Sequence, residues 1–309
     1  MKHYEISRSG LKASSVILGL MRIAKMSDDE IRALVDGAVA AGINMVDHAD
    51  IYGGETHLCE QRFGAAMRLT PAAREKIIIQ SKAGIRKGYF DFSEAHILEA
   101  VDGSLKALRT DYLDVLLLHR PDALVEPEEV ASAFDKLGAA GKVRHFGVSN
   151  HSAGQIELLK TAVRQPLIAN QVQLSIVHAP LIAQGVAINM ADLEQSVDRT
   201  LGLLDYSRKQ GMTLQAWSPF QRGFFGGPFV GDRETYAELN VALDEIAAAH
   251  SVTPSAIAVA WITRHPANIQ VVLGTTKLAR VKEAVAGAGV ALSREEWYRL
   301  FRAAGYMVP

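Results

Sequence analysis

The residues most suited to chemistry follow three successive apolar runs of the chain. Asp47 and Tyr52 lie in the segment Asp-His-Ala-Asp-Ile-Tyr-Gly, and Lys82 and His119 follow the next two runs. A tyrosine has an ordinary pKa of about 10, which a neighbouring ammonium lowers, while a carboxylate holds that ammonium in place. These side chains predict one site in which Lys82 lowers the pKa of Tyr52 toward neutral pH, so that Tyr52 acts as a proton donor. His119 can hydrogen-bond a carbonyl oxygen beside it.

Eight short β-type runs recur along the chain, with helical patterns between them. Most are continuous apolar stretches, which is typical of strands that are covered on both faces in a parallel sheet. Helices must then form the crossovers. The predicted strands are 15–19, 44–49, 76–81, 113–118, 143–148, 167–174, 213–217 and 269–273.

Helix signals occupy the intervening segments. Ser27 and Glu30 form a capping box before an amphipathic pattern, and Gly42 is a stop signal. Ser93 is predicted to begin a second helix, and Pro127 fits the first turn of a third. The regular alternation of strand and helix runs through the chain without a proline-rich or serine-rich linker.

Two folds share this local pattern: a single (β/α)8 TIM barrel that spans residues 1–309, and an open, doubly wound sheet. The positions of the polar residues favour the barrel, because a closed barrel gathers its strand ends into one ring at the catalytic face. The first eighteen residues, with a turn at Ser9 and Gly10, are predicted to form a β-hairpin that closes the barrel bottom. The polar residues at the predicted strand ends are Asp47, Lys82, His119, Ser149, Asn150, Asn170, Gln171, Ser218 and Thr275.

Two segments break the regular spacing and predict long loops on the C-terminal face. Residues 176–200 form an extended strand-to-helix connection, and residues 220–232 are rich in Gly and Phe. Such loops are usually lids or pocket walls, and the alternative for the second segment is a disordered surface excursion. The predicted substrate pocket is lined by Met21, Tyr89 and Phe90, together with residues 220–229 and Tyr306. This apolar and aromatic lining favours aromatic or medium-chain aldehydes and ketones.

The composition is that of an ordinary globular protein, with 49% hydrophobic residues, 22% charged residues and a net charge of −1. The absence of a run of Lys and Arg gives no support to nucleic-acid or membrane-surface binding. The single cysteine, Cys59, excludes an internal disulfide and fits a reducing compartment, so a cytoplasmic location is expected. The expected partner is a small molecule, and the sequence does not predict an oligomeric state.

Several motifs together resemble those of the aldo-keto reductase family, across essentially the whole chain. The resemblance is to the bacterial small-oxidoreductase branch, and it implies a (β/α)8 barrel that binds NADP(H) without a Rossmann motif and reduces carbonyl compounds. The motifs are Asp47-x4-Tyr52-Gly53, Lys82 after Ile-Ile-Ile-Gln-Ser, Leu-His119-Arg-Pro, Gly-Val-Ser149-Asn150, Asn170-Gln171, Trp217-Ser218 and Gly274-Thr-Thr-Lys277.

The resemblance implies a role for each matched residue. Tyr52 is similar to the family's general acid, Lys82 and Asp47 to the pair that tunes its pKa, and His119 to the residue that orients the substrate carbonyl. Trp217 takes the position of the aromatic residue that stacks on the nicotinamide ring. The remaining predicted contacts at this end of the cofactor are Ser149, Asn150, Gln171 and Ser218.

A different segment is predicted to bind the cofactor phosphate, because no Gly-x-Gly-x-x-Gly follows an early strand. Thr276 is predicted as the N-cap of a helix over 277–288, whose first turn holds Lys277 and Arg280, where the helix dipole disfavours cations. A bound 2′-phosphate of NADP resolves this conflict, and the alternative is a solvated helix start. The predicted contacts at this end are Gly274, Thr275, Thr276, Lys277, Arg280 and Glu283.

The chain departs from the family pattern at two positions. His48 stands where a small hydroxyl residue is common, and Ala284 stands where many members have an adenine-binding asparagine. His48 and Asp50 are interpreted as structural hydrogen-bond partners rather than as catalytic groups. Arg120, which follows His119, either fixes a loop or touches the substrate, and the sequence leaves both roles open.

Three other functions compete with carbonyl reduction. In the first, Lys82 forms a Schiff base in an aldolase-like barrel, although Asp47 is expected to keep that lysine charged. In the second, His48, Asp50 and His119 bind a metal in a hydrolase, although no His-x-His pair is present and no metal is predicted. The third is a non-enzymatic NADP(H)-binding sensor or regulatory subunit on the same fold.

Overall fold

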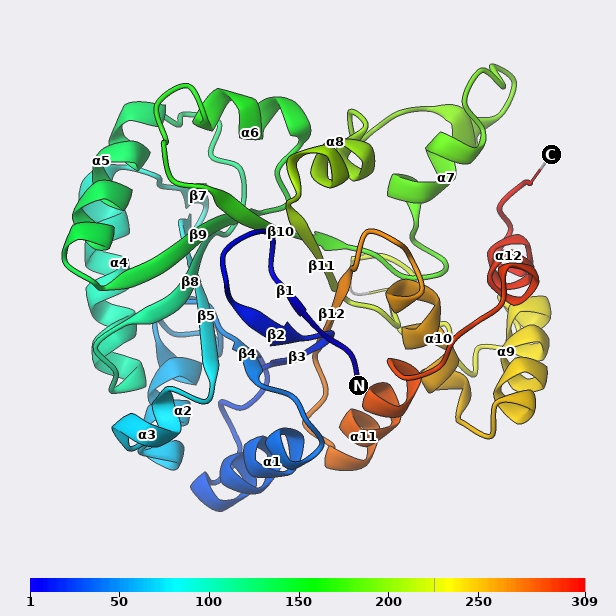
Figure 1. Cartoon of the computed structure of the whole chain (residues 1–309), viewed down its shortest axis with the longest axis horizontal. Coiled ribbons are helices and arrows are strands. Elements are labelled where there is room, and N and C mark those ends of the chain that lie inside the picture. The colour runs from blue at the N-terminus through cyan, green and yellow to red at the C-terminus, as the bar shows by residue number, and fades with distance from the viewer. Residues whose placement is uncertain (225, 309) are drawn as a thin grey trace.

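The computed structural model describes residues 1–224 and 226–308, and within them eight parallel strands close into a barrel (Figure 1). The closed ring confirms the predicted (β/α)8 barrel and rules out the open sheet. Each strand pairs with its neighbour along the chain, and β12 pairs with β3 to complete the ring. The barrel strands are β3 (Val16–Gly19), β4 (Met45–Asp47), β5 (Ile78–Ala83), β8 (Leu113–Leu118), β9 (Val143–Ser149), β10 (Leu167–Gln173), β11 (Thr213–Trp217) and β12 (Gln270–Leu273).

Helices cover the outside of the barrel, and three of the predicted helix starts are confirmed. Ser27 and Glu30 form the capping box of α1, the Ser93 side chain caps α4, and Pro127 is the first residue of α5. The helices are α1 (Asp28–Ala40), α2 (Leu58–Met67), α3 (Pro71–Arg74), α4 (Glu94–Leu108), α5 (Pro127–Ala139), α6 (Ala153–Leu159), α7 (Pro180–Val186), α8 (Leu203–Gln210), α9 (Ala237–Ala249), α10 (Pro254–Thr263), α11 (Leu278–Gly287) and α12 (Arg294–Ala303).

The predicted strands lie within about two residues of those in the structure, and one difference affects the site. The prediction ended a strand at residue 81, but β5 continues to Ala83 because Lys82 and Ala83 pair with Leu117 and Leu118 of β8. Lys82 therefore lies within a strand rather than in the loop that follows it. Its backbone is fixed on both sides, by β8 and by the loop after β4, because Asp50 N donates to its carbonyl oxygen.

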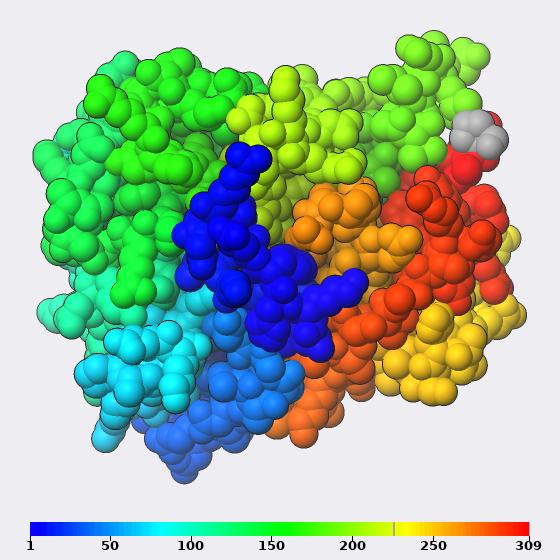
Figure 2. Space-filling view, viewed as in Figure 1, coloured from blue at the N-terminus to red at the C-terminus, as the bar shows by residue number. Residues whose placement is uncertain are grey.

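The N-terminal hairpin closes the bottom of the barrel, as predicted. Strands β1 (His3–Glu5) and β2 (Lys12–Ser14) pair in antiparallel fashion and lie across the barrel opening in Figures 1 and 2. Ile6 and Ala13 of this segment pack with the inward-facing residues of the strands in a small apolar cluster. A larger apolar core lies between the strands and the surrounding helices. The bottom of the barrel is therefore filled, and its open face is the C-terminal rim.

The long connection predicted over residues 176–200 is present between β10 and α8, and it holds secondary structure of its own. It contains α7 and a short 3-10 helix, η1 (Glu194–Ser196). Pro180 occupies the first turn of α7, and Leu181 and Ile182 of that helix are buried against the core. The apolar residues of the segment thus form a short helix because they have a core surface to cover.

The Gly-rich and Phe-rich loop over residues 220–232 is anchored at its described positions, and Phe225 lies outside the described residues. Arg222 forms a 3.0 Å ion pair with Asp232, and Phe229 is fully buried. Phe229 N also donates to the carbonyl oxygen of Phe220. These contacts favour an ordered wall over a disordered excursion.

No single helix in residues 1–224 and 226–308 has both the length and the apolar character needed to cross a membrane. Helices α9 and α10 pass that test only as a pair, with a bend of 91° between them.

Candidate active site

The four predicted catalytic residues come together because they lie on, or just after, neighbouring strands. Asp47 is the last residue of β4, and in the register it pairs with Gln80 of β5, two residues before Lys82. Tyr52 lies on the loop that follows β4. His119 follows β8, and its backbone N–H donates to the carbonyl oxygen of Ala83. The parallel arrangement therefore places all four residues at the same rim.

The Lys82 ammonium is buried and makes three hydrogen bonds. Its Nζ donates to Asp47 Oδ2 at 2.6 Å, to the His48 carbonyl oxygen at 2.8 Å and to Tyr52 Oη at 3.0 Å. An ammonium has three N–H donors, so all of them are used. The arrangement fixes the position of the charge directly beside the Tyr52 hydroxyl.

Buried glutamines hold the other side of Asp47, and the sequence reasoning did not find this network. Gln80 Nε2 and Gln171 Nε2 donate to Asp47 Oδ1 at 2.5 Å and 2.9 Å. Both amides also donate to Gln215 Oε1, and Gln215 Nε2 donates to Gln270 Oε1. The signal was present in the sequence, because four of the predicted strands each contain a glutamine. Asp47 is thus held by three donors in all.

The pKa values of this pair follow from burial and from the nearby charges. Burial lowers the pKa of Lys82, but Asp47 and Tyr52 outweigh it, so the pKa of Lys82 is raised and the lysine stays charged. Burial raises the pKa of Tyr52 and the Lys82 charge lowers it, with a net rise. The Lys82 charge does lower the pKa of Tyr52, as predicted. The predicted net fall of that pKa toward neutral pH was wrong, because the rise caused by burial is larger.

His119 lies against Tyr52 as a neutral imidazole. The two rings meet edge to face, with their centroids 5.8 Å apart. Burial lowers the pKa of His119 well below its ordinary value, and the charges of Lys82 and Arg120 lower it further. Among the described residues, none hydrogen-bonds its buried Nδ1. A neutral ring beside that of Tyr52 suits the predicted contact with a carbonyl oxygen.

His48 and Asp50 do not hydrogen-bond each other, so their interpretation as partners was wrong. His48 is fully buried and packs edge to face on Phe63, and neither of its ring nitrogens has a partner among the described residues. Burial lowers its pKa to about 4. Asp50 instead forms a 2.9 Å ion pair with Arg86, and burial raises its pKa to about 6. The two side chains have different neighbours although they are close in sequence.

The residues predicted at the nicotinamide end form a connected group. Asn150 Nδ2 donates to Ser149 Oγ at 2.8 Å, and Asn150 Oδ1 accepts from the Trp217 indole at 3.0 Å. Ser149 Oγ donates to the carbonyl oxygen of Gln171 at 2.9 Å. Asn150 and Ser218 both have positive φ, at 62° and 53°, as each chain segment turns away from its strand. Four side chains from three strand ends thus share one part of the rim.

The predicted phosphate end is more open, and its helix begins later than predicted. Helix α11 begins at Leu278 with Lys277 as its N-cap, so the prediction of Thr276 as N-cap was wrong. Thr275 Oγ1 instead accepts from Lys277 N at 3.2 Å, which makes a turn before the helix. Lys277 and Arg280 are exposed and form no ion pair within the described residues. Both cations therefore remain available at the helix start.

Three other residues lie at or near this end. Arg22, which the sequence reasoning missed, donates from Nη1 to the Gly274 carbonyl oxygen at 3.2 Å. Glu283 is half-buried on α11. Ala284 is buried on the same helix, where it packs in the core. Its side chain is therefore part of the core.

The three residues named for the predicted substrate pocket are all at least partly exposed. Tyr89 and Phe90 are exposed on a short hairpin of β6 (Ile85–Arg86) and β7 (Tyr89–Phe90), and Met21 is half-buried. Their place as pocket walls stays a prediction. Tyr306 accepts a hydrogen bond from Ala179 N at 2.8 Å and thereby holds the C-terminal segment to the start of α7.

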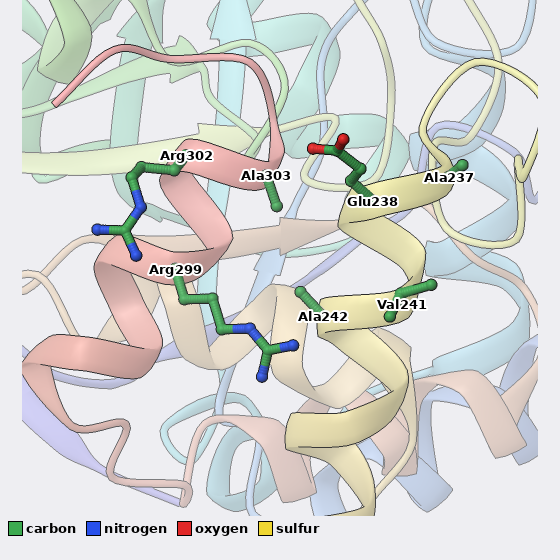
Figure 3. Close-up of a pocket in the computed structure, with 7 residues that line it drawn as sticks. All are labelled: Ala237, Glu238, Val241, Ala242, Arg299, Arg302 and Ala303. Carbon is green, nitrogen blue, oxygen red and sulfur yellow. The ribbon is translucent and has the colours of Figure 1, made fainter.

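Two surface hollows lie elsewhere on the molecule. One lies between α9 and α12, with Arg299, Arg302 and Glu238 at its edges (Figure 3). The other lies between α2 and α4 and is lined by His57 and several basic residues. Neither contains a residue of the predicted site.

The geometry bears on two of the competing functions. Schiff-base formation needs a neutral amine, and Lys82 is held as a charged donor by three acceptors. Within residues 1–224 and 226–308, no group of three or more His, Cys, Asp or Glu side chains is arranged to hold a metal ion. Neither the aldolase-like nor the hydrolase alternative gains support from this site.

A closed parallel barrel with a tyrosine, a buried ammonium and a carboxylate at its rim has the features of a barrel oxidoreductase. The sequence profile of the Aldo/keto reductase family matches residues 15–303. An uncharacterized oxidoreductase, YcsN, of Bacillus subtilis is 38% identical over 97% of both chains. Oxidoreductase YdhF of Escherichia coli is 35% identical over 98% of both chains, and a 6-dehydroglucose reductase of Agrobacterium fabrum is 34% identical over 94% of both.

A solved structure of a thermostable aldo-keto reductase in complex with the inhibitor epalrestat matches 98% of this chain, with a TM-score of 0.78 and 26% identity. The protein belongs to the Aldo/keto reductase family and is an oxidoreductase.

Proposed function

We propose that the protein is an NADP(H)-dependent reductase that converts aldehydes or ketones to alcohols, with Tyr52 as the proton donor. The observation that carries the proposal is the 3.0 Å hydrogen bond from Lys82 Nζ to Tyr52 Oη, in a lysine whose other donors are held by Asp47 and His48. This arrangement serves no apparent packing purpose, because it buries a charge in the rim of the barrel. The buried ammonium does suit a tyrosine that must lose and regain a proton, because it stabilises the phenolate.

The proton transfer follows from the charges around Tyr52. Because its net pKa is raised, Tyr52 is protonated at neutral pH and holds a proton to donate. As the proton moves to the carbonyl oxygen, the phenolate that remains is stabilised by the adjacent Lys82 ammonium. Neutral His119 provides a second hydrogen bond to the same oxygen, which is an oxyanion-hole role. Tyr52 and His119 thus bracket the position where negative charge develops.

The residues at the rim fit a nicotinamide nucleotide. When bound, this cofactor supplies the hydride that is added to the carbonyl carbon. Gln171 uses its side-chain amide nitrogen for Asp47 and Gln215, and none of the described residues donates to its side-chain oxygen, Oε1. That oxygen suits the carboxamide NH2 group of a nicotinamide, with Asn150 and Ser149 beside it. The Trp217 indole would stack on the nicotinamide ring.

The exposed cations at α11 would hold the cofactor phosphate. Lys277 and Arg280 lie where the helix dipole disfavours positive charge, and no acidic side chain pairs with them among the described residues. A phosphate would gain from the helix N-terminus, from both cations and from the hydroxyl groups of Thr275 and Thr276. This supports NADP(H) rather than NAD(H), whose ribose 2′-hydroxyl needs an acidic partner.

The test is reduction of a panel of neutral aldehydes, followed by the loss of NADPH absorbance, with NADH in parallel. The panel should include a sugar aldehyde, because two relatives are named 6-dehydroglucose reductases. We expect turnover with NADPH and slower turnover with NADH at equal concentration. Binding of NADPH without turnover of any aldehyde would contradict the proposal and favour the sensor alternative.

A further inference from the structure

Arg120 differs from the other arginines that are shielded from solvent. Five arginines in residues 1–224 and 226–308 are buried or half-buried, and four of them hydrogen-bond to a carboxylate, a carbonyl oxygen or both. Arg120 forms no hydrogen bond and no ion pair with any described residue. The four satisfied arginines are Arg62, Arg74, Arg86 and Arg264.

The surroundings of Arg120 place it in the catalytic rim. It directly follows His119, and its guanidinium lies 5.7 Å from the Trp217 ring centroid and 5.9 Å from that of Phe224. Its charge acts on both Tyr52 and His119. The cation therefore faces the same space as the proposed proton donor and the proposed nicotinamide-stacking residue.

The nearest acidic residue along the chain is not available to Arg120. Asp122 lies two residues further on, but Oδ2 accepts from Phe92 N at 3.0 Å and Oδ1 accepts from Leu124 N at 2.9 Å. Asp47, the carboxylate of the site, is already held by Lys82 and two glutamines. Residues 1–224 and 226–308 thus supply no anion for a guanidinium that is partly withdrawn from water.

A half-buried guanidinium without hydrogen bonds is costly, and contacts with aromatic rings offset only part of that cost. Its planar fork matches the two oxygens of a carboxylate or phosphate in a bidentate pair. The 2′-phosphate of the cofactor is already provided for at α11, whereas Arg120 lies at the opposite, nicotinamide end of the proposed cofactor site, beside Trp217. The remaining molecule that enters this rim is the substrate.

We infer that Arg120 binds an anionic group of the substrate, so that the preferred substrates are carbonyl compounds that carry a carboxylate or a phosphate. The inference rests on the proposed reductase function, because it assigns the chemical class of the substrate for that site. It also revises the expectation of purely apolar substrates. Trp217 and Phe224 then form the aromatic frame that orients the guanidinium.

The first experiment compares aldehydes that differ in charge but little in size. Succinic semialdehyde is paired with its methyl ester, and D-glyceraldehyde 3-phosphate is paired with D-glyceraldehyde. The wild type should favour the anionic member of at least one pair by about tenfold or more in kcat/KM, which is the low end for a charged hydrogen bond. The pair with the larger ratio tells whether carboxylate or phosphate is preferred. In Arg120→Gln the ratio should fall to about one, and Arg120→Lys should retain part of it.

Arg144→Gln is the matched control. Arg144 also lies over an aromatic ring, that of Tyr112, but it is the second residue of β9 and so lies at the opposite end of the barrel. This variant removes the same charge and should keep the wild-type ratio. A loss of the ratio in Arg144→Gln would show that net charge, rather than a site at Arg120, sets the preference, and would overturn the inference.

A binding measurement separates this inference from the proposed activity. Benzoate and benzamide are titrated while fluorescence is recorded, since Trp217 is half-buried at the rim and Trp261 and Trp297 are buried elsewhere. Benzoate should bind at least about tenfold more tightly than benzamide, and Arg120→Gln should equalise them. If no aldehyde is reduced but benzoate binds in this way, the reductase function fails and the anion site stands. If aldehydes are reduced without any charge preference and benzoate binds no better than benzamide, only the anion site is wrong.

Discussion

The catalytic centre and the phosphate end of the proposed cofactor site are built in opposite ways. In the centre, Lys82 and Asp47 are buried, and every donor of the ammonium is used by a protein acceptor. At the start of α11, Lys277 and Arg280 are exposed, and the helix has no side-chain cap. The fold therefore sets the catalytic geometry in advance, whereas the phosphate end depends on its ligand for partners.

This difference predicts where mutations act. A change in the pre-arranged centre should affect turnover, because the geometry is present before substrate binds. A change at the open end should affect cofactor affinity and leave the chemical step alone. The two regions can therefore be separated by measuring turnover and binding on the same variants.

The largest expected effect is that of Tyr52→Phe, which removes only the hydroxyl that Lys82 contacts. Turnover should fall by about 10²–10⁴-fold, the usual contribution of general acid catalysis, while NADPH affinity stays nearly unchanged. Turnover is measured with a saturating aldehyde, and NADPH binding by fluorescence. Tyr206→Phe is the control, because that hydroxyl donates to Glu157 on the outside of the barrel. Retention of more than about a tenth of the activity would show that Tyr52 is not the proton donor.

The next largest effect is expected at the start of α11, where Lys277 and Arg280 are replaced together by Ala. NADPH binding should weaken by roughly 2–4 kcal/mol, with each charged hydrogen bond at about 1.5–3 kcal/mol and an allowance for salt screening. NADH binding should hardly change. The measurement is the dissociation constant of each reduced cofactor at one fixed salt concentration.

The control for that double variant is Lys106→Ala with Arg164→Ala, which removes two exposed cations on other parts of the barrel. It should leave both dissociation constants unchanged. An equal loss of NADPH and NADH affinity in the Lys277 and Arg280 variant would contradict recognition of the 2′-phosphate.

The two regions also differ in how far the sequence could predict them. Lys82, Asp47 and Tyr52 could be placed together because each lies at or just after the end of a strand, and parallel strands end at one rim. The cap of α11 was placed one residue early, because Thr275 rather than Thr276 makes the turn hydrogen bond. Such a choice depends on backbone geometry, which residue types alone do not determine.

Long-range contacts account for the rest of what the sequence did not predict. Gln80 and Gln215 are 135 residues apart, and nothing in their local sequence says that they meet. The net pKa of Tyr52 likewise depends on burial by the folded chain. That Arg120 has no hydrogen-bond or ion-pair partner in the described part of the chain is visible only when the other shielded arginines are seen to have partners.

The glutamine network offers a sharper test of the pre-arranged centre. Gln80→Leu removes the 2.5 Å hydrogen bond to Asp47 Oδ1 and leaves the Lys82 pair in place. A hydrogen bond to a charged group contributes about 1.5–3 kcal/mol, so kcat should fall by about 10–100-fold if Asp47 must be held in one orientation. NADPH affinity should change much less.

Gln270→Leu is the control for the network, because Gln270 bonds to Gln215 and to the Ser14 carbonyl oxygen but not to Asp47. It should lower the free energy of unfolding without lowering kcat to the same degree. Equal losses of kcat in Gln80→Leu and Gln270→Leu would mean that the network supports the barrel as a whole rather than positioning Asp47.

The smallest predicted effect concerns His48, the exception within the well-bonded centre. Its pKa of about 4 lies below the ordinary value of about 6.5, so between these values the unfolded chain binds more protons than the folded one. Stability should therefore fall as the pH drops, and His48 alone should contribute a loss of about 2 kcal/mol between pH 7 and pH 5.

His48→Leu tests this contribution by urea unfolding at both pH values. The apolar side chain cannot take up a proton and leaves no unpaired nitrogens against Phe63, so the variant should lose about 2 kcal/mol less than the wild type on acidification. His3→Leu, at an exposed position in β1, should keep the wild-type loss. If His48→Leu loses as much stability between pH 7 and pH 5 as the wild type does, the His48 imidazole is not the group that takes up the proton. The acid sensitivity would then belong to other buried histidines, such as His151, whose pKa burial also lowers to about 4.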